Sequence, residues 1–393
     1  MGLIVRLAKS GKARRRRAVG TPSIQEKLES YKAFLLGSST ERPLIGFWVG
    51  SNFPLPRYRG SKSLLGQDYL VPEAVKPEAF LDDYDRIIRE GESIGDDMIV
   101  VAEPFWGIPW MEAIMGCPVR VSADSIWSEP FIDDPGKAAG MIAPEVLSGN
   151  KWLRALVEFT EVLVKHSAGR YPVGTPVLRG PADMLAAMMG VENFVMACWS
   201  SPESVHKFAR VCTEVWLQVA RTVLQRIPPF QAGHGISFYN LWVPGEGLWF
   251  QEDATAFLSP SLYREFVFPC DVGISAAFDY SLVHLHSACL FHVEDLLEVE
   301  SLSVVEINKD PTGPAVRELI PILGRIQEVK PLLIWGSLTD EDIEEILDSL
   351  SPRGLYLHLI VDSVEQAGSL LEKIKSRCAR RSATNGGGLQ KLC

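Results

Sequence analysis

Eight short apolar segments recur along the chain, and segments with helical patterns alternate with them. The apolar segments are residues 43–49, 98–102, 173–178, 235–239, 282–286, 304–307, 332–335 and 355–358. The helical patterns are residues 24–36, 82–93, 152–166, 202–226, 259–268, 292–297, 315–327, 340–350 and 363–375. Short apolar runs bounded by turn residues are typical of buried strands, and strands that alternate with helices form parallel sheets. The pattern predicts a single (β/α)8 TIM barrel with an N-terminal helical extension.

An open doubly wound sheet is the alternative to the barrel. Such a sheet usually carries a glycine-rich phosphate loop after its first strand. Here the first strand is followed by GSNFP, which is not such a loop. We therefore expect the barrel.

The two ends of the chain differ in charge from the rest. Residues 1–22 contain seven Lys or Arg and no acid, and residues 376–393 contain four and no acid. Both are expected to be disordered tails around a barrel of residues 23–375, although the arginine run also resembles a targeting peptide or a nucleic-acid-binding arm. The remaining 28 basic and 49 acidic residues argue against nucleic acid as the main partner.

The apolar runs and the cysteines indicate where such a chain resides. No apolar run is long enough to cross a bilayer, so we expect no membrane association. The seven cysteines are scattered and form no CxxC pair, which suits free thiols in a reducing compartment. A cytoplasmic protein is therefore expected.

The segment SLVHLHSACLFH, residues 281–292, concentrates possible metal ligands. Side chains on a strand repeat every two residues, so His284 and His286 lie on the same face. The pair could share one metal ion or one substrate, or be core histidines with satisfied hydrogen bonds. A third ligand would have to come from another strand end, with Glu103 and His358 as candidates and Cys289 as a weaker one. Three protein ligands and an open position are typical of catalytic zinc.

Polar and aromatic residues also follow the other predicted strands. The active site of a barrel lies at the C-terminal ends of its strands, so these residues are expected to meet at one mouth. The candidate acid/base groups are Glu103 and Asp183, alongside the two histidines. The candidate substrate-binding residues are Asn52, Trp106, Arg179, Tyr239, Asn240, Trp242 and Trp335.

Each candidate also has a structural interpretation. Arg179 and Asp183 could form an ion pair at a helix start. Asn308 and Asp310 suit a turn, and a lone His358 suits a core.

Four segments resemble diverged members of the uroporphyrinogen decarboxylase superfamily. They are residues 100–130, 178–193, 251–270 and 282–299, within a resemblance that covers about residues 25–375. The resemblance implies a (β/α)8 barrel. Decarboxylases of this superfamily act on an octa-carboxylate tetrapyrrole without a cofactor, and carry Arg-Gln-Ala-Gly-Arg after the first strand. Residues 50–57 here read GSNFPLPR, so that motif is absent.

The second branch of the superfamily performs corrinoid-dependent methyl transfer. Its zinc is held by His-x-Cys on the fifth strand and by a later cysteine near the eighth, and activates a thiol. By this resemblance His284 matches the histidine, His286 replaces the first cysteine and His358 falls near the later one. Imidazoles in place of thiolates make a harder zinc, which makes water or another acceptor more possible.

The resemblance implies an enzyme, most simply a methyltransferase with zinc and a corrinoid (cobalamin) methyl carrier as cofactors. Its partners would be a small-molecule substrate, a corrinoid protein and a second copy of the chain, as a homodimer. The alternatives are a carboxy-lyase acting on a tetrapyrrole or small molecule, and a barrel that binds a ligand without catalysis.

Overall fold

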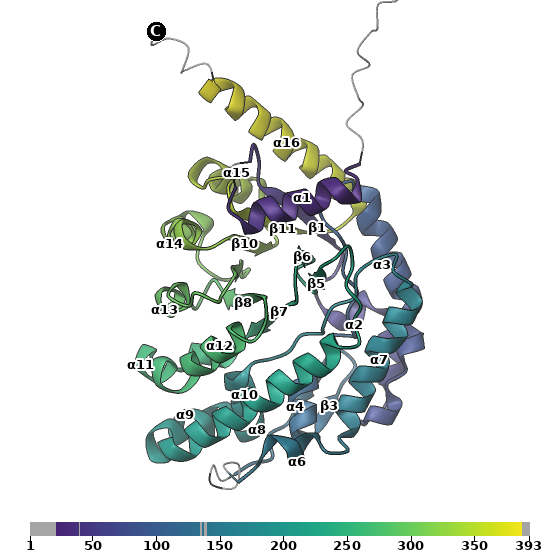
Figure 1. The fold of residues 1–393 in the computed structure, drawn as a ribbon, viewed down its shortest axis with the longest axis vertical. Coiled ribbons are helices and arrows are strands. Elements are labelled where there is room, and N and C mark those ends of the chain that lie inside the picture. Colours follow the sequence, from purple (N-terminus) through teal and green to yellow (C-terminus); the bar gives the residue numbers. More distant parts are fainter. Residues whose placement is uncertain (1–20, 39, 134–135, 137–139, 387–393) are drawn as a thin grey trace, which may run out of the picture.

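A parallel sheet of six strands forms the centre of the molecule, and helices surround it (Figure 1). The computed structural model describes residues 21–38, 40–133, 136 and 140–386. The strands, in their order across the sheet, are β1 (Leu44–Val49), β11 (Leu355–Val361), β10 (Leu332–Gly336), β9 (Val304–Asn308), β8 (Tyr280–His286) and β7 (Gly247–Gln251). The predicted strands at 43–49, 282–286, 304–307, 332–335 and 355–358 are confirmed.

Two further predicted strands, residues 98–102 and 173–178, lie beyond β7 as extended segments. Parallel bridges join Arg179 to Gln251 and Ala102 to Val173. The Asp97 N–H then donates to the Ile45 carbonyl of β1 at 3.0 Å. The first of these segments is not a regular strand, because the Ile99 N–H donates to the Tyr31 hydroxyl and the Val101 N–H donates to Asn240 Oδ1.

Helices surround the sheet, most of them on its outer face, whereas α1 lies across its inner side (Figure 1). They are α1 (Ile24–Leu35), α2 (Pro54–Arg57), α3 (Leu81–Ile94), α4 (Trp110–Met115), α6 (Ala143–Leu147), α7 (Lys151–Ser167), α8 (Pro181–Met189), α9 (Val191–Ser200), α10 (Pro202–Leu224), α11 (Pro260–Leu262), α12 (Phe268–Ser275), α13 (Val293–Leu297), α14 (Val316–Val329), α15 (Asp340–Ser349) and α16 (Val364–Gly386). Capping boxes at Ser23 and Thr339 start α1 and α15, since each side chain satisfies a free helix N–H. In the described part of the chain no helix has the length and apolarity that a membrane span requires.

The predicted tails are corrected at one end. Helix α16 continues to Gly386, so the expectation of disorder from residue 376 is wrong for residues 376–386. Residues 1–20 and 387–393 lie outside the described residues, and the expectation for them stays a prediction.

A small antiparallel sheet flanks the main one, formed by β2 (Tyr69–Leu70), β3 (Val119–Val121) and β4 (Ile126–Ser128).

The predicted strand at residues 235–239 is confirmed only at its start, and it is not part of the parallel sheet. This segment forms one arm of an antiparallel hairpin, β5 (His234–Ile236) with β6 (Leu241–Val243). The turn between them holds Phe238 at φ +59° and Asn240 at φ +50°, which a continuous strand would not allow. The strand of the parallel sheet at this point is β7, whose sequence GLWFQ is fully buried.

The hairpin fills the inner face of the sheet. Strand residues alternate between two buried clusters, and the cluster away from the outer helices includes the hairpin. This inner cluster comprises Leu28, Tyr31, Phe34, Leu44, Ile99, Ile236, Tyr239, Leu241, Trp242, Val243, Trp249, Leu282, Val304, Leu333, Trp335 and Tyr356. The hairpin and α1 thus close the interior below the C-terminal strand ends.

Asn240 is expected to contribute to stability through one buried hydrogen bond. Its Oδ1 accepts the Val101 N–H at 2.8 Å, and the residue is 5% exposed. Asn240→Gly keeps the left-handed backbone but leaves that N–H unpaired, which should lower the free energy of unfolding by about 1–3 kcal/mol. Urea unfolding measures the change. Ala232→Gly, at an exposed position with φ +61°, is the matched control and should not destabilise the protein; equal effects would contradict the assignment.

Candidate active site at the C-terminal strand ends

A cavity of about 750 Å³ opens at the C-terminal ends of the strands. Its lining comes from loops far apart in the sequence, as expected for a barrel-like arrangement. The lining includes the predicted residues Asn52, Trp106, Arg179, Asp183, Tyr239, His284, His286 and Trp335. The prediction that these side chains meet therefore agrees with their placement, whereas their roles remain predictions.

His284 and His286 project from the end of β8 into this cavity, and their ring centroids are 4.7 Å apart. The register of the sheet places Glu306 of β9 opposite His284. Glu306 Oε2 lies 2.5 Å from His284 Nδ1, and the Tyr239 hydroxyl lies 2.7 Å from the same nitrogen. Asp310 Oδ1 lies 2.6 Å from His286 Nδ1. Each imidazole is therefore oriented through Nδ1, which leaves Nε2 directed elsewhere.

The Asp253 carboxylate lies opposite both Nε2 atoms. Its Oδ1 is 3.9 Å from His284 Nε2 and 3.6 Å from His286 Nε2. Ligand atoms of Asp253, His284 and His286 all lie within 4.8 Å of one another. The Gln251 amide donates to Asp253 Oδ2 at 2.7 Å and orients the carboxylate. The arrangement offers two imidazole nitrogens and one carboxylate oxygen to a cation.

The charge of His284 is set by its surroundings. Burial acts to lower the pKa of His284, but the charge and hydrogen bond of Glu306 outweigh it and raise this pKa to about 9. The Asp310 carboxylate is stabilised as an anion by its hydrogen bond to His286, so its pKa is lowered despite partial burial. Without a bound cation, Glu306 therefore favours the protonated form of His284.

Arg179 and Asp183 line the same cavity and do not form the ion pair that their spacing suggested. Arg179 Nη1 bonds instead to Glu112 Oε1 at 3.0 Å, and Glu112 is 1% exposed. Asp183 Oδ1 accepts the Ala254 N–H at 2.7 Å. Burial, and next the charge of Asp253, raise the pKa of Asp183 to about 8. The positive charge of Arg179 is thus paired with the buried Glu112 carboxylate.

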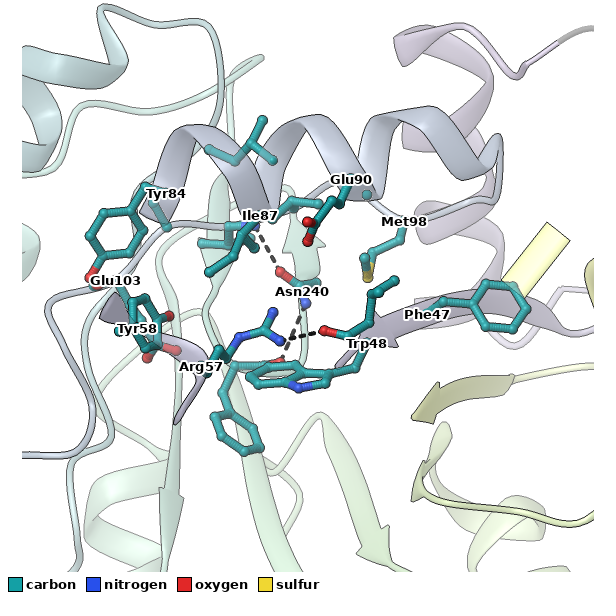
Figure 2. A pocket seen from close by; sticks show the side chains of 17 residues that line it. Phe47, Trp48, Arg57, Tyr58, Tyr84, Ile87, Glu90, Met98, Glu103 and Asn240 are labelled. Atoms are coloured by element: carbon teal, nitrogen blue, oxygen red, sulfur yellow. Dashed lines mark hydrogen bonds between the residues drawn. The ribbon is translucent and has the colours of Figure 1, made fainter. Parts of the chain in front are cut away.

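Glu103 is not in the cavity at the strand ends. It lines a separate inner cavity of about 30 Å³ between β1, α3 and the hairpin, where Figure 2 shows Arg57 over the Trp48 ring. Burial raises the pKa of Glu103 to about 8, and a hydrogen bond from Ser237 opposes the shift. The two histidines line the other cavity, so the structure does not bring Glu103 together with them.

Three other predicted residues also lie elsewhere. Asn240 lines the inner cavity, and Trp242 is buried in the hairpin, where its Nε1 donates to the Phe230 carbonyl at 2.9 Å. His358 is 0% exposed, and neither ring nitrogen has a hydrogen-bond partner. Burial lowers the pKa of His358 to about 3. Strand β11 continues to Val361, so His358 lies below the strand end, and Asp253 occupies the position proposed for it as third ligand.

Sequence reasoning missed Asp253 and Glu306. Asp253 lies two residues after β7. If the apolar run 247–251 had been predicted as a strand, Asp253 would have been placed at a strand end. Glu306 interrupts the buried strand VVEIN on the face that carries Asn308. A carboxylate within a buried strand signals a buried partner, which here is His284.

A solved structure shares this fold. A methyltransferase from Methanosarcina mazei superimposes with a TM-score of 0.61 at 11% sequence identity, covering 88% of this chain and 97% of that one. No protein-family model and no curated protein sequence matches the chain. At this identity the similarity establishes a methyltransferase-like fold, and the chemistry must be argued from the site.

Proposed function

We propose that this protein is a methyltransferase, built on a closed (β/α)8 barrel, that uses zinc held by His284, His286 and Asp253. The convergence of these three side chains at the base of the 750 Å³ cavity carries the proposal. The extended segments between β7 and β1 supply the two positions that eight strands require, which supports the closed barrel. The shared fold with a methyltransferase supports the reaction type.

The donor set fits zinc. Catalytic zinc takes three protein ligands and keeps an open position, and its histidines usually hold a carboxylate through the other ring nitrogen. Glu306 and Asp310 fill that role at Nδ1 of His284 and His286. Since Gln251 orients Asp253, each of the three ligands has an outer partner.

When bound, zinc would lower the pKa of a thiol or water that coordinates at its open position. Methyl transfer then needs a deprotonated acceptor, a methyl carbon aligned with it, and a donor that leaves with the bonding electron pair. The aromatic walls Trp106, Tyr239 and Trp335 exclude water around the methyl group. Two nitrogens and one oxygen are harder ligands than thiolates. Zinc held by them therefore favours water or another hard methyl acceptor more strongly than zinc held by thiolates does.

The rim suits a large methyl carrier such as a corrinoid, free or on a partner protein. Phe53, Trp127 and Phe257 line the cavity and are 67%, 40% and 61% exposed. Apolar rims of this kind are typical of binding sites. A tetrapyrrole octa-carboxylate is less suited, because Arg179, the only Lys or Arg of the described lining, already bonds to Glu112.

Anaerobic turnover of methylcobalamin tests the proposal. Zinc-loaded protein should convert methylcobalamin and a small thiol or water into cob(I)alamin and the methylated acceptor, followed by absorbance and mass spectrometry. Asp253→Ala should slow this by roughly 100-fold or more, because one of three ligands is lost. Asp82→Ala, at an exposed acid, is the control. If zinc-loaded protein transfers the methyl group neither to a small thiol nor to water, the proposal is overturned.

A further inference from the structure

We propose that Asp183 and Glu252 are positioning residues that hold the backbone on both sides of Asp253. This inference rests on the proposed zinc site, since it assigns how one ligand is placed. Asp183 lies in the first turn of α8, and Glu252 directly follows β7. The two carboxyl groups connect these two segments, which are about seventy residues apart in the sequence.

The connection is reciprocal. Asp183 Oδ1 accepts the Ala254 N–H at 2.7 Å, and Glu252 Oε2 accepts the Ala182 N–H at 2.7 Å. Asp183 is 7% exposed and Glu252 is 5% exposed. Because buried bonds to carboxyl oxygens are strong and directional, the pair fixes the peptide groups around Asp253 relative to α8.

Gly180 allows this arrangement. The Gly180 N–H donates to the Gln251 carbonyl at 2.8 Å, and a Cβ atom at Gly180 would lie 2.1 Å from Glu252 Oε1. A side chain at this position would therefore displace the Glu252 carboxyl. Three contacts thus tie residues 180–183 to residues 251–254.

This geometry explains why Asp183 lines the cavity without facing a ligand. One of its oxygens is bonded to the Ala254 N–H, and the other has no hydrogen-bond partner. By contrast, the Asp253 side chain is 40% exposed and bonds to Gln251. The orientation of Asp253 toward the histidines therefore depends on Gln251 and on the adjoining backbone, whose Ala254 N–H Asp183 holds.

Zinc affinity, measured by competition with a chromophoric chelator, tests the assignment. Asp183→Ala should raise the Kd for zinc roughly 10- to 100-fold, as loss of an outer partner does at other zinc sites. Asp183→Asn should stay within about threefold of wild type, because its amide oxygen can accept the same N–H. Gly180→Ala, which displaces Glu252 and leaves Asp183 in place, should also raise the Kd. It provides the measurement if Asp183→Ala does not fold.

A double-mutant cycle separates positioning from a general structural effect. If Asp183 acts through Asp253, Asp183→Ala should not change the Kd further in an Asp253→Ala background. Independent effects in the two backgrounds would overturn the positioning role while the zinc site stands. Wild-type protein that binds no zinc would overturn both the site and this inference.

Discussion

The double variant Asp253→Ala, His286→Ala is expected to bind zinc roughly 10,000-fold more weakly than wild type, or not at all. It loses two of three ligands, and each zinc ligand contributes on the order of 2.5–3 kcal/mol. His284 is kept because Glu306 is 0% exposed and would lose its partner, which costs several kcal/mol by itself. Calorimetric titration with zinc measures the loss.

The control for this experiment removes the same residue types elsewhere. Asp82 is exposed, and His206 is 40% exposed, lying 3.5 Å from Glu265 and against the Phe266 ring. Asp82→Ala, His206→Ala should bind one zinc with wild-type affinity. If both double variants bind zinc as wild type does, the metal lies elsewhere.

Glu103→Gln is expected to stabilise the protein increasingly as the pH rises. The pKa of Glu103 is raised by burial from 4.5 to about 8 in the folded state. Below pH 4.5 the Glu103 carboxyl is mostly protonated in both the folded and the unfolded state, so its ionisation changes the stability little. Between pH 4.5 and 8 the unfolded state ionises first, so wild type loses stability that the glutamine variant keeps. The difference should grow by roughly 3–5 kcal/mol over this interval.

Urea unfolding of both proteins at pH 4.5, 6 and 8 measures this difference. Comparing variant with wild type cancels the contributions of the other titrating groups. A difference that is the same at all three pH values would show that Glu103 is ionised in the folded protein. A difference that shrinks with rising pH would mean that its pKa is lowered in the folded state.

Local periodicity was sufficient to predict the histidine pair. His284 and His286 share a face because strand side chains alternate, and both lie within the final residues of β8. The same reasoning wrongly placed His358 at the C-terminal end of its strand, because β11 continues three residues beyond it. In the sheet, His358 pairs with Gly46 and Trp335, in the interior below the mouth.

Errors in the fourth strand had a larger consequence. Residues 235–239 have the apolar character of a strand, yet the backbone at Phe238 and Asn240 turns through positive φ. Asn adopts that conformation readily and Phe does not, so only tertiary packing selects it here. Misplacing the strand hid Asp253, whose position depends on β7.

The partners of the site depend on contacts that the sequence order does not reveal. Glu306 meets His284 through the register of β8 with β9, and Asp183 meets Ala254 through the packing of α8 against the end of β7. Similarly, α16 continues through residues 376–386, although the composition of this segment suggests a disordered tail. These features require the three-dimensional arrangement.

The zinc site is the central claim, and anomalous diffraction at the zinc absorption edge tests it most directly. Crystals of protein prepared with one equivalent of zinc should show a single strong anomalous peak between His284 Nε2, His286 Nε2 and the Asp253 carboxylate. Ligand distances of about 2.0–2.2 Å are expected. A map with no peak at these three side chains, or with its main peak elsewhere on the protein, would contradict the account.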